Sequence, residues 1–338
     1  MPEGPAQVSG VNGRRPAALA LGLVLLGGAL LLLGTGIGAS GFDGVLQAWS
    51  DPTALQIVRD IRLPRTLGAW LAGALLGLGG ALAQGLFRNP LADPYLLGSA
   101  SGAHLGVSLL LVALGVSPAA SGWAARLGMT GAAFVGAVLA VFVTLALARG
   151  VQQTLRLLLA GVVVGMVLGA ASSLVVLWVP DIMRAMQAFM LGTTGFLGWP
   201  SVILLAGALL VCLVPSIGFA RALDALTLGE ATATSLGIAL PWVRVALIAA
   251  LALATGAAVA QLGLVAFVGL VAPHLVRAVV KPTHGWLVLL ASLMGGALLL
   301  AADVLARWLM APQELPVGVV TALLGGGYLL WLMHRRSL

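Results

Sequence analysis

The sequence predicts an all-α integral membrane protein of about ten transmembrane helices, built as a single transmembrane domain over residues 1–338. Two observations predict this fold class. Hydrophobic residues make up 61% of the chain and charged residues only 8%, whereas soluble domains carry about 25% charged residues. Apolar runs of membrane-spanning length, about 20 residues, also recur along the whole sequence. Because so few charges cannot cover a water-exposed surface, the outer surface of the chain must face lipid.

The first predicted span, 17–38, follows Arg14 and Arg15 and resembles a signal peptide at first sight. It is longer than the 7–15 residues typical of a signal-peptide apolar region, and further spans follow it. We therefore expect it to be retained. The other predicted spans are 64–86, 95–115, 125–148, 153–177, 199–220, 241–262, 263–279, 286–309 and 315–334. The span 263–279 is the shortest and contains Pro273.

Three internal stretches are polar enough to lie outside the bilayer. Residues 39–63 and 178–198 connect spans on the side away from the termini. The stretch 221–240 lies on the side of the termini and is expected to form two short helices broken at Gly229. A short helix outside the membrane must bury one face against something, so 221–240 is a candidate docking element for a cytoplasmic partner.

An even number of spans places both termini on one side of the membrane. Most of the 17 lysine and arginine residues fall in segments on that side, and positively charged loops are typically cytoplasmic. Both termini are therefore predicted to be cytoplasmic. The same rule accounts for the net charge of +7. Nucleic-acid binding is not expected, because no basic stripe with aromatic residues is present.

Glycine is abundant, with 46 residues, and several glycines are spaced four residues apart within spans. Gly161, Gly165 and Gly169 form one such stripe, and Gly73 and Gly77 another. Small residues at this spacing let helix backbones approach closely in lipid. One interpretation is tight packing within the chain. The other is that the stripe Gly161–Gly169 lines a movable interface or a transport pathway.

Several kinds of chemistry are excluded by the residues. No phosphate-binding loop is present, and the only lysine, Lys281, precedes Pro282, so any ATP must bind to another chain. The lone Cys212 can form neither an internal disulfide nor a thiolate metal site. Ala100 stands where a nucleophile elbow would need serine. We expect no catalytic residue, no bound metal and no cofactor in this chain.

Few ionisable residues lie within the predicted spans and away from their ends. They are His104, Arg244, His274 and Asp303. Asp303 is the only carboxylate among them, and Arg307 lies one helical turn away, so the two are expected to pair. A paired carboxylate argues against a proton or sodium relay. An ion-coupled secondary transporter is the alternative function, although it would need such a relay. An intramembrane enzyme is the third class considered.

A series of short motifs lies along the chain from about Ile61 to the C-terminus. They are IRLPR at 61–65, QGLFRNPLADP at 84–94, LGSASGA at 97–103, RLLLAG at 156–161, LGEA at 228–231 with LG at 236–237, FVGLVAPHLVR at 267–277, AD at 302–303 and ELPVG at 314–318. In this order the set resembles the FecCD family, the permeases of ABC importers for iron–siderophores, haem and cobalamin.

The resemblance implies a fold of ten transmembrane helices per subunit, working as a homodimer in the bacterial inner membrane with the pathway between the subunits. Two cytoplasmic ABC ATPase subunits would bind and hydrolyse ATP with Mg²⁺. A periplasmic or lipid-anchored binding protein would deliver the substrate. The implied mechanism is alternating access without chemistry on the substrate. The sequence does not separate haem, siderophore and cobalamin, and we expect an iron complex first, with cobalamin close behind.

The resemblance also implies roles for particular residues. The docking site for the binding protein corresponds to Arg62, Arg65 and Arg307. The contact with the ATPase corresponds to Leu228, Gly229, Glu230, Ala231 and Gly237, although the full E-A-A-x-x-x-G pattern of other importers is missing. The gate and pathway correspond to Asn89, Pro90, Thr154, Gly161, Gly165 and Gly169.

Overall fold

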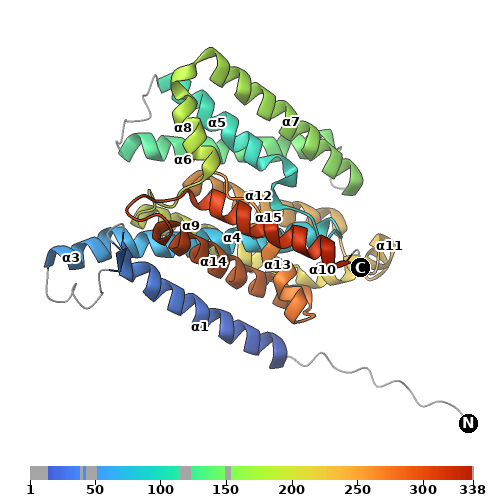
Figure 1. Ribbon diagram of the computed structural model, residues 1–338. Helices are drawn as coiled ribbons and strands as arrows, with labels where there is room; N and C mark the ends of the chain where they lie inside the picture. Colours follow the sequence, from blue (N-terminus) through green and yellow to red (C-terminus); the bar gives the residue numbers. More distant parts are fainter. Residues whose placement is uncertain (1–13, 39–40, 43–51, 115–122, 149–153, 337–338) are drawn as a thin grey trace, which may run out of the picture.

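The computed structural model describes residues 14–38, 41–42, 52–114, 123–148 and 154–336, and most of them are helical (Figure 1). Eight helical stretches among them are long and apolar enough to cross a membrane, and α5 and α13 are shorter apolar helices. These helices are α1 (Arg14–Gly36), α4 (Leu63–Leu86), α5 (Ser99–Leu114), α6 (Trp123–Leu147), α7 (Thr154–Trp178), α9 (Trp199–Gly218), α12 (Leu240–Leu262), α13 (Val268–Val279), α14 (His284–Trp308) and α15 (Val317–Arg336). Each predicted span thus contains an apolar helix, which confirms the predicted all-α membrane fold.

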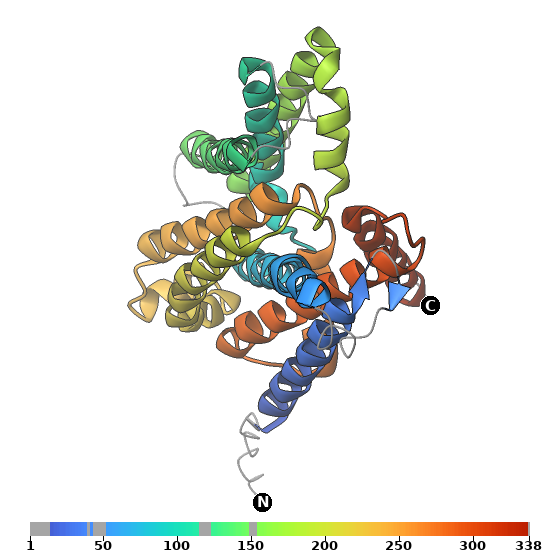
Figure 2. The same cartoon turned by 90° about the vertical axis from the view of Figure 1, so that its left-hand side faces the viewer.

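Helix α4 forms the centre of the bundle and is packed against α9, α12, α13 and α14. In Figure 2 it is viewed nearly end-on, with α1 on the side away from the α5–α8 group. Its glycines explain the tight packing. A Cβ atom on Gly77 would lie 2.1 Å from the carbonyl oxygen of Ala291, and one on Gly73 would lie 2.3 Å from that of Gly295. The packing interpretation is confirmed for Gly73 and Gly77.

The chain re-enters the bundle after α4 instead of starting the next helix at its end. It turns at Arg88, whose φ is +50°, and forms the short 3₁₀ helix η2 (Pro94–Leu97). The Tyr95 hydroxyl donates to the carbonyl oxygen of Val265 at 3.1 Å, and the Thr144 hydroxyl donates to that of Leu97 at 3.0 Å. Because this segment already lies among the helices, α5 begins at Ser99 and is shorter than the predicted span 95–115.

A similar irregular segment precedes α13. Residues 263–267 are not helical. The amide of Leu264 donates to the carbonyl oxygen of Phe189 at 3.0 Å, and Phe267 has a φ of +69°. The helix therefore starts at Val268, five residues later than predicted, and Pro273 lies inside it.

The stretches predicted to lie outside the bilayer contain more helix than expected. In 39–63, α3 (Pro52–Ile57) continues through the π-helical turn η1 (Val58–Arg62) directly into α4. The second helix thus begins well before the predicted residue 64. Ahead of it, β1 (Ile37–Gly38) pairs antiparallel with β2 (Gly41–Phe42). In 178–198, η3 (Pro180–Ile182) leads into α8 (Met183–Leu191).

The stretch 221–240 forms two short helices, as predicted. They are α10 (Ala220–Thr227) and α11 (Glu230–Ser235), and Gly229 between them has a φ of +110° that favours glycine. Figure 1 shows α10 and α11 at the same end of the molecule as the first turn of α1 and the last turn of α15. We call this end the α11 end.

Candidate functional site

The segment around α11 exposes apolar side chains. Leu228 and Leu236, which flank α11, are 68% and 64% exposed, and Ala231 and Gly237 are also exposed. By contrast α10 is fixed to the bundle. Asp224 on α10 accepts hydrogen bonds from the backbone amide of His284 at 3.0 Å and pairs with its Nδ1 at 2.7 Å. The outer face of α11 is thus exposed beside a helix that is held against the bundle.

Glu230 at the start of α11 is partly exposed and lies against two arginine side chains. Its Oε1 accepts a hydrogen bond from Nη2 of Arg244 on α12 at 2.5 Å. The same oxygen lies 3.6 Å from Nη2 of Arg88, in the turn after α4. The Arg244 side chain is only 8% exposed, whereas that of Arg88 is 42% exposed. One carboxylate therefore joins α11 to two other parts of the fold.

The predicted gate residues Asn89 and Pro90 lie in the exposed turn directly after Arg88. The turn is well defined, because Asn89 Oδ1 accepts from the amide of Leu91 at 2.9 Å and the Asn89 amide donates to the carbonyl oxygen of Gln84 at 3.2 Å. Thr154 is the first residue of α7.

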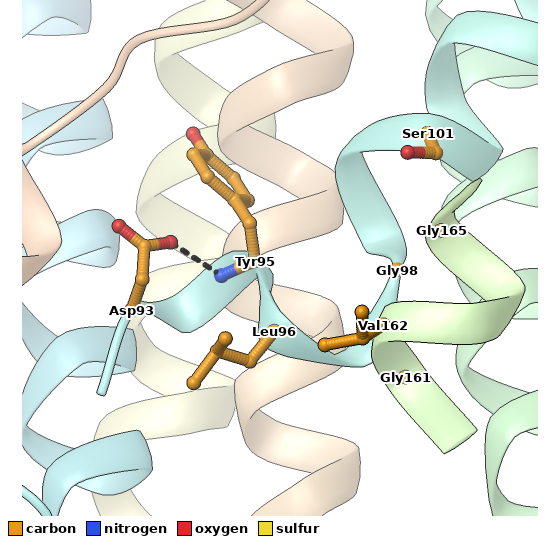
Figure 3. Close-up of a pocket in the computed structure, with 8 residues that line it drawn as sticks. All are labelled: Asp93, Tyr95, Leu96, Gly98, Ser101, Gly161, Val162 and Gly165. Carbon is orange, nitrogen blue, oxygen red and sulfur yellow. Dashed lines mark hydrogen bonds between the residues drawn. The ribbon is translucent and has the colours of Figure 1, made fainter. Parts of the chain in front are cut away.

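A hollow of about 230 Å³ lies between the re-entrant segment and α7 (Figure 3). It is lined by Asp93, Tyr95, Leu96, Gly98, Ser101, Gly161, Val162 and Gly165. Asp93 caps η2 by accepting from the amide of Tyr95 at 2.8 Å. Figure 3 shows Gly98 at the start of α5 beside Gly161 and Gly165 of α7. The structure thus brings two of the predicted pathway glycines to one hollow.

The three glycines of α7 have different surroundings. A Cβ atom on Gly161 would lie 2.0 Å from the carbonyl oxygen of Leu96, so this position packs directly on η2. At Gly165 the nearest atom would be Ser101 Oγ at 3.6 Å, and at Gly169 there is nothing within 4 Å. Close packing therefore explains Gly161, while Gly165 borders the hollow and Gly169 faces open space.

At the end opposite α11, charged side chains from distant parts of the chain form one network. Arg65 makes two hydrogen bonds with Glu314, at 2.9 and 2.8 Å, and another with Thr194 Oγ1 at 3.2 Å. Its Nη2 also lies 3.4 Å from Asp303 Oδ1, which accepts a short hydrogen bond from Thr194. The positive and negative charges in the network balance, so it is internally neutralised.

Arg307 completes this network from within the bundle. Its Nη2 lies 2.7 Å from Asp303 Oδ2, a contact of opposite charges rather than a well-aligned hydrogen bond. Its Nη1 donates to the carbonyl oxygens of Gly34 at 2.8 Å and Ile37 at 3.1 Å. The predicted pair of Asp303 and Arg307 is confirmed. Acidic side chains from α14 and the following loop thus neutralise both Arg65 and Arg307.

Burial also separates the three predicted docking arginines. The Arg307 side chain is 2% exposed and that of Arg65 13%. Arg62, the last residue of η1, is half-buried. Arg307 therefore presents no surface to a protein that approaches this end, and only Arg62 and the edge of Arg65 do.

The partners that neutralise or link the predicted residues could not be identified from the sequence. Glu314 lies within the motif at 314–318, but nothing in the sequence indicated its pairing with Arg65. Arg88 belongs to the motif at 84–94 and Arg244 to a predicted span, and neither position indicated a contact with Glu230. In the described ranges, no group of three histidine, cysteine, aspartate or glutamate side chains is placed to hold a metal ion.

Comparison with known proteins agrees with this arrangement. The model of the FecCD transport family matches residues 20–335. The hemin transport system permease HmuU of Yersinia pestis is 37% identical over 96% of this chain and 98% of its own length. The vitamin B12 import system permease BtuC of Klebsiella pneumoniae is 38% identical over 85% of both chains. A cobalamin import permease of Halobacterium salinarum is also 38% identical, over 86% of this chain and 77% of its own length.

Solved structures show the same fold. A structure described as an inward-facing conformation of a metal-chelate type ABC transporter superposes with a TM-score of 0.83 at 26% identity. The match covers 94% of this chain and 99% of that one. The PsaBC structure from Streptococcus pneumoniae matches with a TM-score of 0.59 over 85% of this chain at 14% identity, a likeness of fold alone.

Proposed function

The chain belongs to the FecCD transport family and is a permease of the ABC importer type, and we propose that two copies of it form the pathway by which a metal chelate enters the cell. The observation that carries this proposal is the family match over residues 20–335, together with relatives that are themselves import permeases. The proposed mechanism is alternating access. The chain moves its substrate without changing it and is not itself an enzyme.

The α11 end is proposed as the cytoplasmic docking site for two ATPase subunits, one for each copy of the chain. The exposed Leu228 and Leu236 provide apolar contacts for a groove on each ATPase. The lack of a phosphate-binding loop in this chain requires that ATP and Mg²⁺ be bound by the partner. Since the first turn of α1 and the last turn of α15 lie at this same end, both termini are proposed to be cytoplasmic.

The pathway is proposed to lie beside α7 and α15, between the two copies. Both helices leave apolar side chains uncovered, among them Met166 at 70% and Leu323 at 72% exposure. Both also border a hollow. That beside α7 contains Gly161 and Gly165, and that beside α15, of about 200 Å³, contains Phe267 and Tyr328. Lipid would cover the remaining apolar faces of the bundle, such as that of α1.

The end opposite α11 is proposed to face the substrate-binding protein. In this proposal Arg62 and the exposed edge of Arg65 contact acidic side chains of that protein. Arg307 has a different role from the one expected, because its side chain is buried against Gly34, Ile37 and Asp303. It holds the ends of α1 and α14 together beneath the docking surface.

We propose an iron complex as the substrate, either haem or a ferric siderophore, with cobalamin as the next candidate. Support for haem comes from the relative from Yersinia pestis, which aligns over nearly the full length of both chains. Identity to the cobalamin permeases is equally high, but the aligned part is shorter. The chain offers no metal-ligating cluster in its described ranges, which suits a chelate that crosses intact.

The test is a substrate comparison in proteoliposomes that contain this chain, its ATPase and its binding protein. Accumulation of haem, of a ferric siderophore and of cobalamin is measured separately. ATP and the ATPase are enclosed in the vesicles, and the binding protein is added outside. The proposal expects ATP-dependent accumulation of an iron complex. Accumulation of cobalamin alone would reject the proposed substrate and leave the importer function intact. No accumulation of any chelate would reject the proposed function.

A further inference from the structure

We infer that Glu230 is a positioning residue that carries the movement of α11 to the gate turn after α4, and is not itself a contact to the ATPase. This inference rests on the proposed function, in which the ATPase displaces α11. Glu230 is assigned the link between the displacement of α11 and the movement of the gate turn that opens or closes the pathway.

Glu230 contacts two arginine side chains, one on α12 and one in the turn after α4. Its Oε1 is bound to Arg244 at 2.5 Å and lies 3.6 Å from Arg88. Arg244 is nearly buried, and a buried guanidinium must keep a carboxylate partner or lose a large part of its stabilisation. The Glu230 side chain is 36% exposed, but turning it fully outward to an ATPase would break its contact with the nearly buried Arg244.

The outer face of α11 has no other charge with which to bind a partner electrostatically. Its hydroxyls are also engaged with its own backbone. Thr234 Oγ1 donates to the carbonyl oxygen of Glu230 at 2.9 Å, and Ser235 Oγ to that of Ala231 at 2.9 Å. The partner must therefore bind this face mainly through apolar contacts to Leu228 and Leu236. Docking and transmission are thus assigned to opposite faces of α11.

The chain after Arg88 leads through the Asn89 turn to η2, and η2 packs on α7. The turn at Asn89 is closed by hydrogen bonds to Leu91 and Gln84. Asp93 then caps η2, and η2 packs on the backbone of Gly161 so closely that no side chain fits between them. A displacement of the Arg88 turn is therefore passed to α7 beside the hollow of Figure 3.

The test separates binding of the ATPase from coupling. Arg88→Gln removes the exposed arm of the link and leaves the buried pair of Glu230 and Arg244 intact, so its folding is not at risk. Glu230→Gln removes both arms. Arg221→Gln, on the exposed side of α10, is the matched control for loss of one arginine charge. For each variant, ATPase binding, ATP hydrolysis and substrate imported per ATP are measured in proteoliposomes with the binding protein.

We expect Arg88→Gln to bind the ATPase and hydrolyse ATP like the wild type, while substrate imported per ATP falls roughly fivefold, as a coupling energy near 1 kcal/mol implies. The double variant should fall no further than Glu230→Gln alone, because both changes break one link. Additive losses, or an unchanged coupling ratio in Arg88→Gln, would overturn the inference. Loss of ATPase binding in Glu230→Gln with Arg88→Gln unaffected would make Glu230 an ATPase contact. Failure of the wild-type chain to bind any ATPase would instead reject the proposed function.

Discussion

Replacement of Arg307 by methionine should destabilise the protein without a direct effect on binding-protein contacts. Methionine keeps the length and apolar stem of the side chain but removes the guanidinium. That guanidinium is 2% exposed and lies 2.7 Å from Asp303, whose side chain is 0% exposed. Its removal leaves a buried carboxylate with only Arg65, at 3.4 Å, to neutralise it.

The cost follows from the contacts that are lost. Breaking a buried ion pair by removing one partner costs about 3–5 kcal/mol, and the remaining contact to Arg65 places Asp303 near the lower end of that range. The carbonyl oxygens of Gly34 and Ile37 also lose their donor, which adds about 1 kcal/mol or more. A total of about 4 kcal/mol corresponds to a fall in melting temperature of roughly 8 °C, at about 2 °C per kcal/mol.

The assay is thermal unfolding of the detergent-solubilised protein, followed by the loss of the monodisperse peak in size-exclusion chromatography. The compensating variant Asp303→Asn combined with Arg307→Met should recover most of the loss, because no buried charge is then left unpaired. Surface plasmon resonance with the binding protein is measured in parallel. A wild-type melting temperature in Arg307→Met, together with weaker binding-protein affinity, would refute this reasoning and restore Arg307 as a docking residue.

Three further predictions follow from single positions. Gly161→Ala should lower the yield of folded protein, because its Cβ would lie 2.0 Å from a backbone carbonyl oxygen. Gly169→Ala should not, because nothing lies within 4 Å of its Cβ. Expression followed by size-exclusion chromatography measures both yields. Equal effects of the two would contradict this. Leu228→Asp should leave the melting temperature unchanged but weaken pull-down of the ATPase at least tenfold, since a 68% exposed apolar contact is replaced by a charge. Gly77→Ala should destabilise the protein strongly and Gly28→Ala should not. Of these two positions, only Gly77 has the backbone of another helix in the space of a Cβ atom. Equal melting temperatures of the two variants would contradict this prediction.

The features that could be predicted from the sequence are those set by local pattern. Apolar runs located the ten helices, and Gly229 located the break between α10 and α11 because a φ of +110° needs glycine. The pair of Asp303 and Arg307 is one helical turn apart, so its spacing alone was sufficient.

The features that could not be predicted depend on packing between distant segments. Arg65 and Glu314 are 249 residues apart, and only the fold brings them together. The re-entrant segment from Arg88 to η2 is held by Tyr95 bonding to Val265, again a contact between remote residues. The stripe of Gly161, Gly165 and Gly169 looked uniform in sequence, but its three positions differ because η2 covers only one of them.

The most direct test of the importer function is uptake by proteoliposomes from which one component is omitted at a time. This chain, the ATPase, the binding protein and ATP are each left out in turn, and the proton and sodium gradients are collapsed in a separate series. The account predicts that uptake of the chelate is lost with every omission and survives the loss of the gradients. Uptake by this chain alone, driven by an ion gradient, would contradict the account and make Asp303 the first candidate for a coupling site.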